Sequence, residues 1–236
     1  MLANNELGTV QPVAALAAVC SPMGVPVLTD AVQAAGKIAI DVGGLGVDFL
    51  ILGGHKFHGP LGAAALWVRG GRELRPLLVG GGQERQRRSG TPDVPAIVGL
   101  GTACELADRE LAERATHLAS LRDRFEAGLA AIDGAVVHCA ASERLPNTSH
   151  IAFPGVDASA LAIRLDLRGY AVSTGAACSS GATEISPTLA AIGLSAEEAR
   201  GSLRVSFGMP NQRQEVDDLL EALGSEVAAL LAGARR

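Results

Sequence analysis

The residues most able to do covalent chemistry lie in one short glycine-rich cluster. Residues 53–60 read GGHKFHGP and contain Lys56, one of only two lysines among the 20 basic residues. A lysine that persists in such an arginine-rich chain is a candidate for Schiff-base chemistry, because an amine can lose its proton and a guanidinium cannot. The cluster lacks the spacing of a P-loop, although its backbone amides could meet an anion. The alternative is a surface turn with a solvated lysine.

A second polar pair, Asp30 and Gln33, follows a short apolar run. A carboxylate at this place could hold the proton of a pyridinium nitrogen, which keeps such a ring an electron sink. Gln33 could donate to a neighbouring ring oxygen. The competing interpretation of Asp30 is a helix N-cap, which is at least as common.

Among the four cysteines, only Cys178 lies in a stretch of small residues, where an accessible thiol can reach a substrate. Cys20 and Cys139 fall in apolar segments and Cys104 falls on a predicted helix, so we expect these three to be packed and inert. The absence of CxxC pairs argues against a zinc knuckle and a disulfide framework.

Two further segments offer hydrogen-bond donors. Residues 80–91 (GGGQERQRRSGT) are basic and rich in glycine, which favours a phosphate-binding loop that reaches into a neighbouring subunit. A nucleic-acid interpretation is weaker because no aromatic residue interleaves and the whole chain is acidic. Arg204 falls within a predicted strand, where its guanidinium either binds a carboxylate or faces solvent.

These side chains need elements to position them. Apolar runs predict strands at 25–30, 49–52 and 62–68, and helices are expected at 11–20 and 31–36. Such alternation favours a mostly parallel sheet covered on both faces. Residues just past the carboxyl ends of parallel strands face the ligand crevice, and Asp30 and Lys56 both occupy that kind of place.

The second half starts with a helical pattern from residue 93 to about 131, too long for one ordinary helix, which predicts a bend or a bridge between domains. Ser186 before Pro187 is typical of a helix start, and Ser195 predicts another. The remaining expected elements are strands at 135–139, 149–153 and 202–207, and helices at 157–168, 187–192 and 211–232. We expect a domain boundary near residue 113, which gives domains 1–113 and 114–236.

Composition excludes several classes of protein. Of 236 residues, 48% are hydrophobic and 19% are charged, which fits a globular α/β protein and excludes a disordered or coiled-coil chain. The formal net charge of −5 gives no pull towards nucleic acid or anionic membrane. No apolar run approaches the roughly 20 residues that a membrane span needs, and the first residues do not resemble a signal peptide. We therefore expect a cytoplasmic protein that binds neither membrane nor nucleic acid.

Together these segments resemble the cysteine desulfurases, the NifS- and IscS-like enzymes of the class-V aminotransferase family, which use pyridoxal 5′-phosphate. The matching segments, in the family's order, are 3–12 (ANNELGTVQP), 30–33 (DAVQ), 54–60 (GHKFHGP), 80–91, 175–181 (GAACSSG) and 203–208 (LRVSFG). The resemblance implies an α/β fold of the aspartate aminotransferase type. Its large domain would have a mostly parallel sheet, incomplete here, and its smaller C-terminal α/β domain would carry the Cys178 loop.

The resemblance implies that Lys56 holds pyridoxal 5′-phosphate covalently. It further implies that Asp30 pairs with the pyridine nitrogen and Gln33 with the ring oxygen. The other implied cofactor-binding residues are Gly53, Gly54, His55 and, from the partner subunit of a homodimer, Thr91.

For the substrate, the resemblance implies that Asn5 and Arg204 orient the carboxylate of L-cysteine. Cys178 would take the sulfur as a persulfide, release L-alanine and pass the sulfur to an iron–sulfur scaffold or another acceptor protein. No resident metal is implied, although Cys178 is also a candidate transient iron–sulfur ligand.

Two departures from the family pattern bear on activity. Family members carry a long segment ahead of the motif that starts at Ala3, so the chain is expected to be truncated and to expose apolar surface. Gly53 stands where a phosphate-binding serine is usual, which removes one hydroxyl donor. The alternatives are a selenocysteine lyase or another class-V enzyme, and an inactive fragment that retains only dimerisation or partner binding.

Overall fold

The computed structural model describes residues 1–174 and 185–234. The chain divides into two compact units. Unit 1 comprises Met1–Ala3 and Gln11–Leu111, and unit 2 comprises Asn4–Val10 and Ala112–Arg236. Each unit has its own sheet and its own apolar core.

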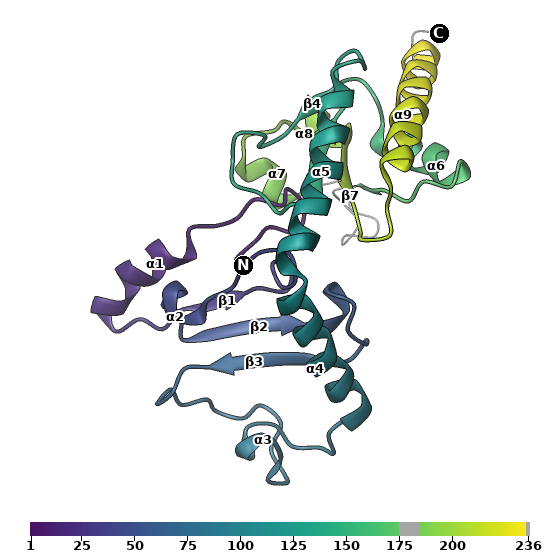
Figure 1. Ribbon diagram of the computed structural model, residues 1–236. Helices are drawn as coiled ribbons and strands as arrows, with labels where there is room; N and C mark the ends of the chain where they lie inside the picture. Colours follow the sequence, from purple (N-terminus) through teal and green to yellow (C-terminus); the bar gives the residue numbers. More distant parts are fainter. Residues whose placement is uncertain (175–184, 235–236) are drawn as a thin grey trace. The chain divides into compact units, whose positions relative to one another are not determined.

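Unit 1 is built on a three-stranded mixed sheet (Figure 1). In spatial order its strands are β1 (Leu28–Asp30), β2 (Phe49–Gly53) and β3 (Ala64–Val68). β1 runs parallel to β2, whereas β3 runs antiparallel to it, because the connection from β2 to β3 is too short for a parallel crossover. The helical elements that precede or follow these strands are α1 (Val13–Cys20), η1 (Ser21–Met23), α2 (Val42–Leu45), η2 (Gly54–Lys56), α3 (Gln83–Gln86) and α4 (Val94–Arg109).

The segment after β1 differs from the expected helix at residues 31–36, and that prediction is wrong. Residues 32–37 form consecutive turns, in which the amides of Ala34 and Ala35 donate to the carbonyl of Ala31. The turns end at Gly36, whose φ of +70° is left-handed and cannot continue a helix. The expected strand from residue 25 is also shorter, because Pro26 has no N–H to give to a ladder.

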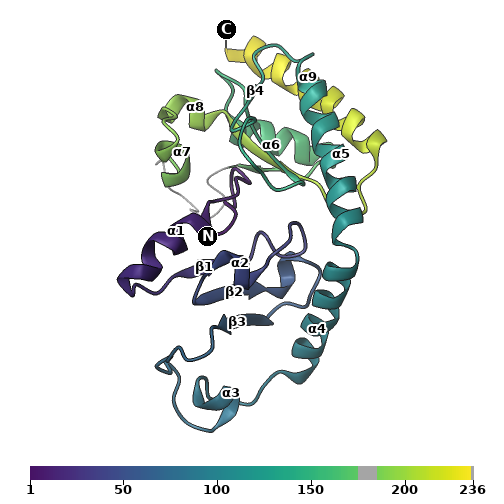
Figure 2. The same ribbon diagram turned by 60° about the vertical axis from the view of Figure 1, so that its left-hand side comes forward.

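Figure 2 shows α4 beside the strands of unit 1. The core of unit 1 joins the turns after β1 to this helix. Asp93 caps α4 by accepting from the amide of Ala96, and Pro95 occupies its first turn. A stripe of small and aliphatic residues on α4 is buried, as its helical spacing requires. The cluster consists of Ala35, Phe57, Ala63, Ala96, Leu100, Ala103 and Ala107.

The long helical pattern bends, as expected. α4 ends at Arg109, Glu110 leaves helical geometry at φ −103° and ψ 3°, and α5 (Leu111–Leu129) begins directly after it.

Unit 2 has a four-stranded antiparallel sheet, and three of its helices pack on one face of it. Its spatial order is β4 (Val136–Val137), β5 (Thr148–Ala152), β7 (Ser202–Ser206) and β6 (Ser173–Thr174). The helices are α5, α6 (Ala158–Leu167), α7 (Pro187–Ala191), α8 (Ala196–Arg200) and α9 (Arg213–Ala234). Alternate residues of β5 and β7, such as Ile151, Leu203 and Val205, pack into one core with α5, α6 and α9.

The predicted helix starts in unit 2 are confirmed. The hydroxyl of Ser186 accepts from the amide of Thr188 at the start of α7. At α8, Ser195 and Glu198 form a reciprocal capping box.

The expected burial of three cysteines is wrong. Cys104 is exposed, because it lies beside the buried stripe of α4 and not within it. Cys20 and Cys139 are half-buried, and Cys139 has a left-handed φ of +56° just after β4.

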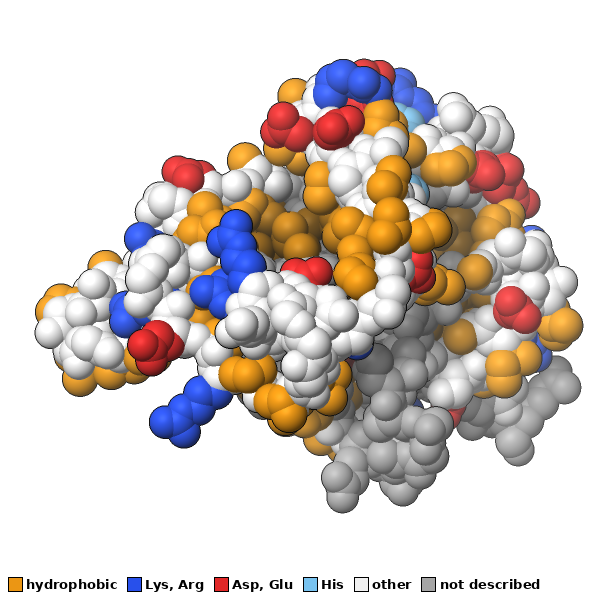
Figure 3. All heavy atoms as spheres, turned by 90° about the horizontal axis from the view of Figure 1, so that it is seen from below, with side chains coloured by type: hydrophobic (Ala, Val, Ile, Leu, Met, Phe, Trp, Pro, Cys, Tyr) orange, Lys and Arg blue, Asp and Glu red, His pale blue; other side chains and the backbone are white. Residues whose placement is uncertain are grey.

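Unit 1 also exposes many large apolar side chains, and such side chains gather on the face drawn in Figure 3. Leu61, Leu77 and Val79 are 82%, 92% and 78% exposed. Exposed apolar surface of this kind marks either an interface or an aggregation hazard. In the described ranges no helix is long and apolar enough to cross a membrane.

The turn at Gly36 provides a test of the unit 1 fold. A Cβ there would lie 2.8 Å from the Cβ of Phe57, so Gly36→Ala adds a steric clash to a left-handed φ. We expect it to lower the free energy of unfolding by about 2–4 kcal/mol in chemical denaturation.

The matched control is Gly24→Ala. Gly24 has a similar φ of +67°, and a Cβ added to it would have nothing within 4 Å. This substitution should cost only about 1 kcal/mol. Equal losses for the two variants would contradict the close packing of Gly36 against Phe57.

Candidate active site

The candidate lysine lies on a tight loop that follows β2. The amides of Phe57 and Gly59 both donate to the carbonyl of Gly54, and the amide of Gly54 donates to Ala63 at the base of the loop. Phe57 is buried and anchors the loop in the core of unit 1, whereas Lys56 is exposed. Phe57 therefore anchors the loop while the amine of Lys56 reaches solvent, which fits both the Schiff-base interpretation and the alternative of a solvated lysine.

Glycine is required in this loop for close backbone approach. A Cβ on Gly59 would lie 2.9 Å from the carbonyl oxygen of Gly54, and a Cβ on Gly54 would lie 3.1 Å from that of Ala63. His55 is exposed beside Lys56, and the first N–H groups of the short η2 turn have no partner within that turn. Because the amides of Gly54, Phe57 and Gly59 already have carbonyl partners, an anion at this loop would bind to other donors, such as the ring of His55.

Asp30 ends the neighbouring parallel strand. It pairs in register with Ile51 of β2, and its Oδ1 accepts from the amide of Val32 at 2.8 Å. A carboxylate retains further lone pairs for a second donor. Asp30 caps a turn and is not a helix N-cap, because no helix follows it.

The turn that carries Gln33 lies against the start of the lysine loop. A Cβ on Gly53 would be 3.3 Å from Cγ1 of Val32 and 3.5 Å from Cε1 of His55. The structure thus brings Asp30, Gln33, Gly53, Gly54, His55 and Lys56 to the ends of two adjacent parallel strands, the edge where ligands of α/β sheets bind. This part of the predicted site assembles within unit 1.

Thr91 closes the glycine-rich loop 80–91 and is exposed. Within that loop Glu84, Arg85 and Gln86 all have left-handed φ values between 52° and 64°. The hydroxyl of Ser89 donates to the carbonyl of Val79, which ties the loop to the chain before it. The contact of Thr91 with a partner's cofactor stays a prediction.

Asn5 and Arg204, the predicted carboxylate-binding pair, meet in unit 2. Nη1 of Arg204 donates to the carbonyl of Asn5 at 2.7 Å. This bond takes one of the five N–H donors of the guanidinium. Arg204 is half-buried on the sheet face opposite the apolar core, so the task of its guanidinium stays a prediction.

Side chains on both sides of Asn5 tie the N-terminal segment of unit 2 in place. Oδ1 of Asn4 accepts from the amides of Glu6 and Leu7, and Oε1 of Glu6 accepts from the hydroxyl of Ser186 at 2.7 Å. The sequence analysis assigned no contact to Glu6, which lies inside the matching segment 3–12.

A buried histidine pair, also missed in the sequence, lies next to Arg204. His150 is the cross-strand partner of Arg204, and its Nδ1 lies 2.8 Å from Nδ1 of His138. Burial, then the charges of His138 and Arg204, lowers the pKa of His150 to about 4. Burial also lowers the pKa of His138, against an opposing effect of Glu198. Both rings are thus held neutral at neutral pH, and a charged ring beside Arg204 is avoided.

The histidine pair predicts a loss of stability in mild acid. The unfolded chain protonates His150 near its ordinary pKa of 6.5, and the folded chain only near 4. The contribution of His150 to the free energy of unfolding is therefore fully present above about pH 7. It falls by roughly 3 kcal/mol as the pH drops from 6.5 to 4.

Denaturation at several pH values measures this loss. His150→Asn should flatten the curve between pH 7 and 4, whereas His58→Asn, at an exposed histidine, should leave it unchanged. The same slope in all three proteins would contradict the buried neutral pair.

Cys178 lies outside the described residues, so its prediction stays a prediction. Among the residues that the structure describes, no group of three or more His, Cys, Asp or Glu side chains could hold a metal.

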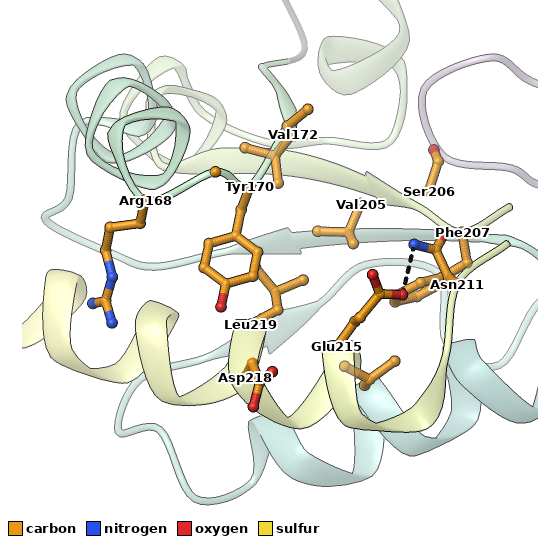
Figure 4. Close-up of a pocket in the computed structure, with 13 residues that line it drawn as sticks. Arg168, Tyr170, Val172, Val205, Ser206, Phe207, Asn211, Glu215, Asp218 and Leu219 are labelled. Atoms are coloured by element: carbon orange, nitrogen blue, oxygen red, sulfur yellow. Dashed lines mark hydrogen bonds between the residues drawn. The ribbon is translucent and has the colours of Figure 1, made fainter.

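A pocket of about 530 Å³ occurs elsewhere in unit 2 and contains none of the predicted site residues (Figure 4). Tyr170, Val172 and Val205 line it together with the first turns of α9. Asn211, just before α9, donates to Glu215 in its first turn. Val205 belongs to the core face of β7, and Arg204, next in the strand, faces the other side.

Comparison with known proteins agrees with this geometry. A family model described as aminotransferase class-V matches residues 1–219. The chain is 45% identical over 231 residues to a cysteine desulfurase of Gluconacetobacter diazotrophicus and 44% identical over 230 residues to an IscS-like cysteine desulfurase of Mycobacterium tuberculosis. These matches cover 98% and 97% of this chain but 58% of each relative, so the chain spans less than two thirds of their length.

Two solved structures also resemble this chain. A NifS-like protein from Rickettsia africae has a TM-score of 0.89 at 33% identity, over 97% of this chain and 60% of that one. SspA in complex with cysteine has a TM-score of 0.71 at 35% identity, over 87% of this chain and 57% of that one.

Proposed function

This chain belongs to the class-V aminotransferase family, and we propose that it forms the catalytic portion of a cysteine desulfurase. The observation that carries the proposal is the arrangement in unit 1, where Asp30 ends β1 and Lys56 follows the adjacent parallel strand β2. A carboxylate and an amine placed this way fit the two ends of a pyridoxal ring. The names of the relatives support the substrate L-cysteine.

The residues present fit pyridoxal 5′-phosphate. Lys56 would hold the cofactor covalently, Asp30 would keep the pyridine nitrogen protonated, and Gln33 would donate to the ring oxygen. The glycine loop, with His55, would bind the phosphate. When bound, the cofactor supplies an electron sink for the carbon next to the substrate amine.

Each chain residue then has a defined task. Asn5 and Arg204 bind the substrate carboxylate, for which the planar guanidinium is well suited. Lys56 would take the proton from Cα of the substrate. The Cys178 thiolate would attack the substrate sulfur, so that an S–S bond forms and the C–S bond breaks with its electron pair left on Cβ. Protonation of Cβ and return of the proton to Cα would then give L-alanine. Sulfur remains on Cys178 as a persulfide.

The wider assembly follows from the same proposal. The protein would act as a homodimer in which Thr91 of one subunit reaches the cofactor phosphate of the other. The persulfide would pass to an iron–sulfur scaffold or another sulfur-acceptor protein. A free thiolate nucleophile needs a reducing compartment, which favours the cytoplasm.

Reductive trapping tests the cofactor site. We expect the purified chain, mixed with pyridoxal phosphate and treated with borohydride, to carry one adduct, which peptide mass spectrometry places on Lys56. Lys56→Arg should abolish the adduct, since a guanidinium forms no Schiff base. At saturating pyridoxal phosphate, Lys37→Arg leaves Lys56 as the only lysine and should still carry the adduct. An adduct confined to Lys37 would contradict the assignment.

Sulfur transfer tests the cysteine. With L-cysteine and pyridoxal phosphate, Cys178→Ser should lose protein-bound persulfide and reduce alanine formation at least about a hundredfold, because the nucleophile is gone. Cys104→Ser, at an exposed cysteine outside the motif, is the matched control and should retain both. Full alanine formation in Cys178→Ser would instead favour a selenocysteine lyase or another class-V activity.

A further inference from the structure

Lys37 is the second of the two lysines in the chain, and the proposed reaction does not use it. Its Nζ donates to the main-chain carbonyl of Gln33 at 2.9 Å. The side chain is half-buried and reaches back over four residues to the turn that starts at Asp30. It is therefore attached to the segment that carries two of the predicted ring contacts.

The backbone next to Lys37 is fixed as well. Gly36 packs against Phe57, and Ala35 belongs to the same buried cluster as Phe57 and residues of α4. Phe57 directly follows Lys56. One short segment thus links the Asp30–Gln33 turn, through Lys37 and Gly36, to the loop that holds the reactive amine.

The electrostatic setting of Lys37 is unusual for a lysine. Burial, followed by the charge of Lys56, lowers the pKa of Lys37 to about 8. The titratable side chains on the neighbouring elements also include Asp30 at the end of β1, His55 on the loop, and Asp108 and Arg109 on α4. An arginine would keep its full charge here, whereas an amine can shed its proton.

Building on the proposed function, we propose that Lys37 is a positioning residue for the cofactor. Its amine holds the Gln33 carbonyl and so fixes the Asp30–Gln33 turn, which sets the carboxylate and the side-chain amide against the pyridine ring. Lys37 does not touch the reacting atoms. A lysine persists at position 37 of this arginine-rich chain because the site needs a compact donor that tolerates the second amine of Lys56 nearby.

The first arm of the test uses the chain without cofactor. Protein made with lysine that carries ¹³C at Cε gives only two side-chain signals, one for each lysine. We expect one signal to titrate with a midpoint near pH 8 and to be absent in Lys37→Met. A midpoint near 10.4, the ordinary value for lysine, would overturn the proposal. Lys37→Met should also speed the hydrogen exchange of the Ala34 and Ala35 amides.

The second arm measures cofactor binding by the visible absorbance of added pyridoxal phosphate. Lys37→Met should weaken the apparent affinity about tenfold and shift the absorption band, while the adduct at saturation still maps to Lys56. Lys37→Gln keeps an N–H donor and should lose less, which covers the case in which the methionine variant fails to fold. Arg75→Met removes an exposed charge of unit 1 and should behave as wild type.

The outcomes separate the two proposals. Wild-type affinity and band position in Lys37→Met would overturn the role of Lys37 and leave the desulfurase assignment intact. No adduct on Lys56 in the wild-type chain would contradict the proposed function, and the role of Lys37 towards the cofactor would fall with it.

Discussion

The packing of the turn after β1 against the loop after β2 is the constraint on which the candidate site depends. Parallel pairing brings Asp30 level with Ile51, and the contact between Gly36 and Phe57 holds the two following segments together. A side chain at position 36 would separate them, because it would meet a buried aromatic residue that has no room to move. The chemistry proposed for Lys56 and Asp30 therefore rests on a glycine that does no chemistry itself.

In unit 2 the guanidinium of Arg204 is half-buried, and the two histidines beside it are uncharged at neutral pH. One face of its sheet is apolar and packs on three helices, while the opposite face places His138, His150 and Arg204 in neighbouring strands. The two imidazoles satisfy each other at Nδ1 and stay neutral, so Arg204 is the only cation in this row at neutral pH. Arg204 is thereby available to a carboxylate and remains anchored to the carbonyl of Asn5.

The sequence was sufficient to predict most elements of the described fold, because apolar periodicity and capping residues such as Ser186 and Ser195 act locally. It failed at residues 31–36, where alanines favour a helix but tertiary packing and the left-handed Gly36 impose turns. The predicted burial of Cys104 was also wrong, because a residue at the border of a helix's apolar stripe can be either covered or exposed. Motif resemblance located Asp30 and Lys56, yet the contact of Lys37 with Gln33 and the histidine pair needed coordinates, because both depend on side chains that meet across turns or strands.

Asp30 and Lys56 are proposed to face the same pyridine ring, and the rest of the mechanism depends on that arrangement. The ¹⁵N spectrum of the chain loaded with ¹⁵N-labelled pyridoxal phosphate reads the protonation of that ring nitrogen directly. We predict a protonated nitrogen in the wild-type chain and an unprotonated one in Asp30→Ala, with the cofactor still attached to Lys56 in both. A nitrogen signal that does not respond to the loss of the Asp30 carboxylate would contradict this arrangement.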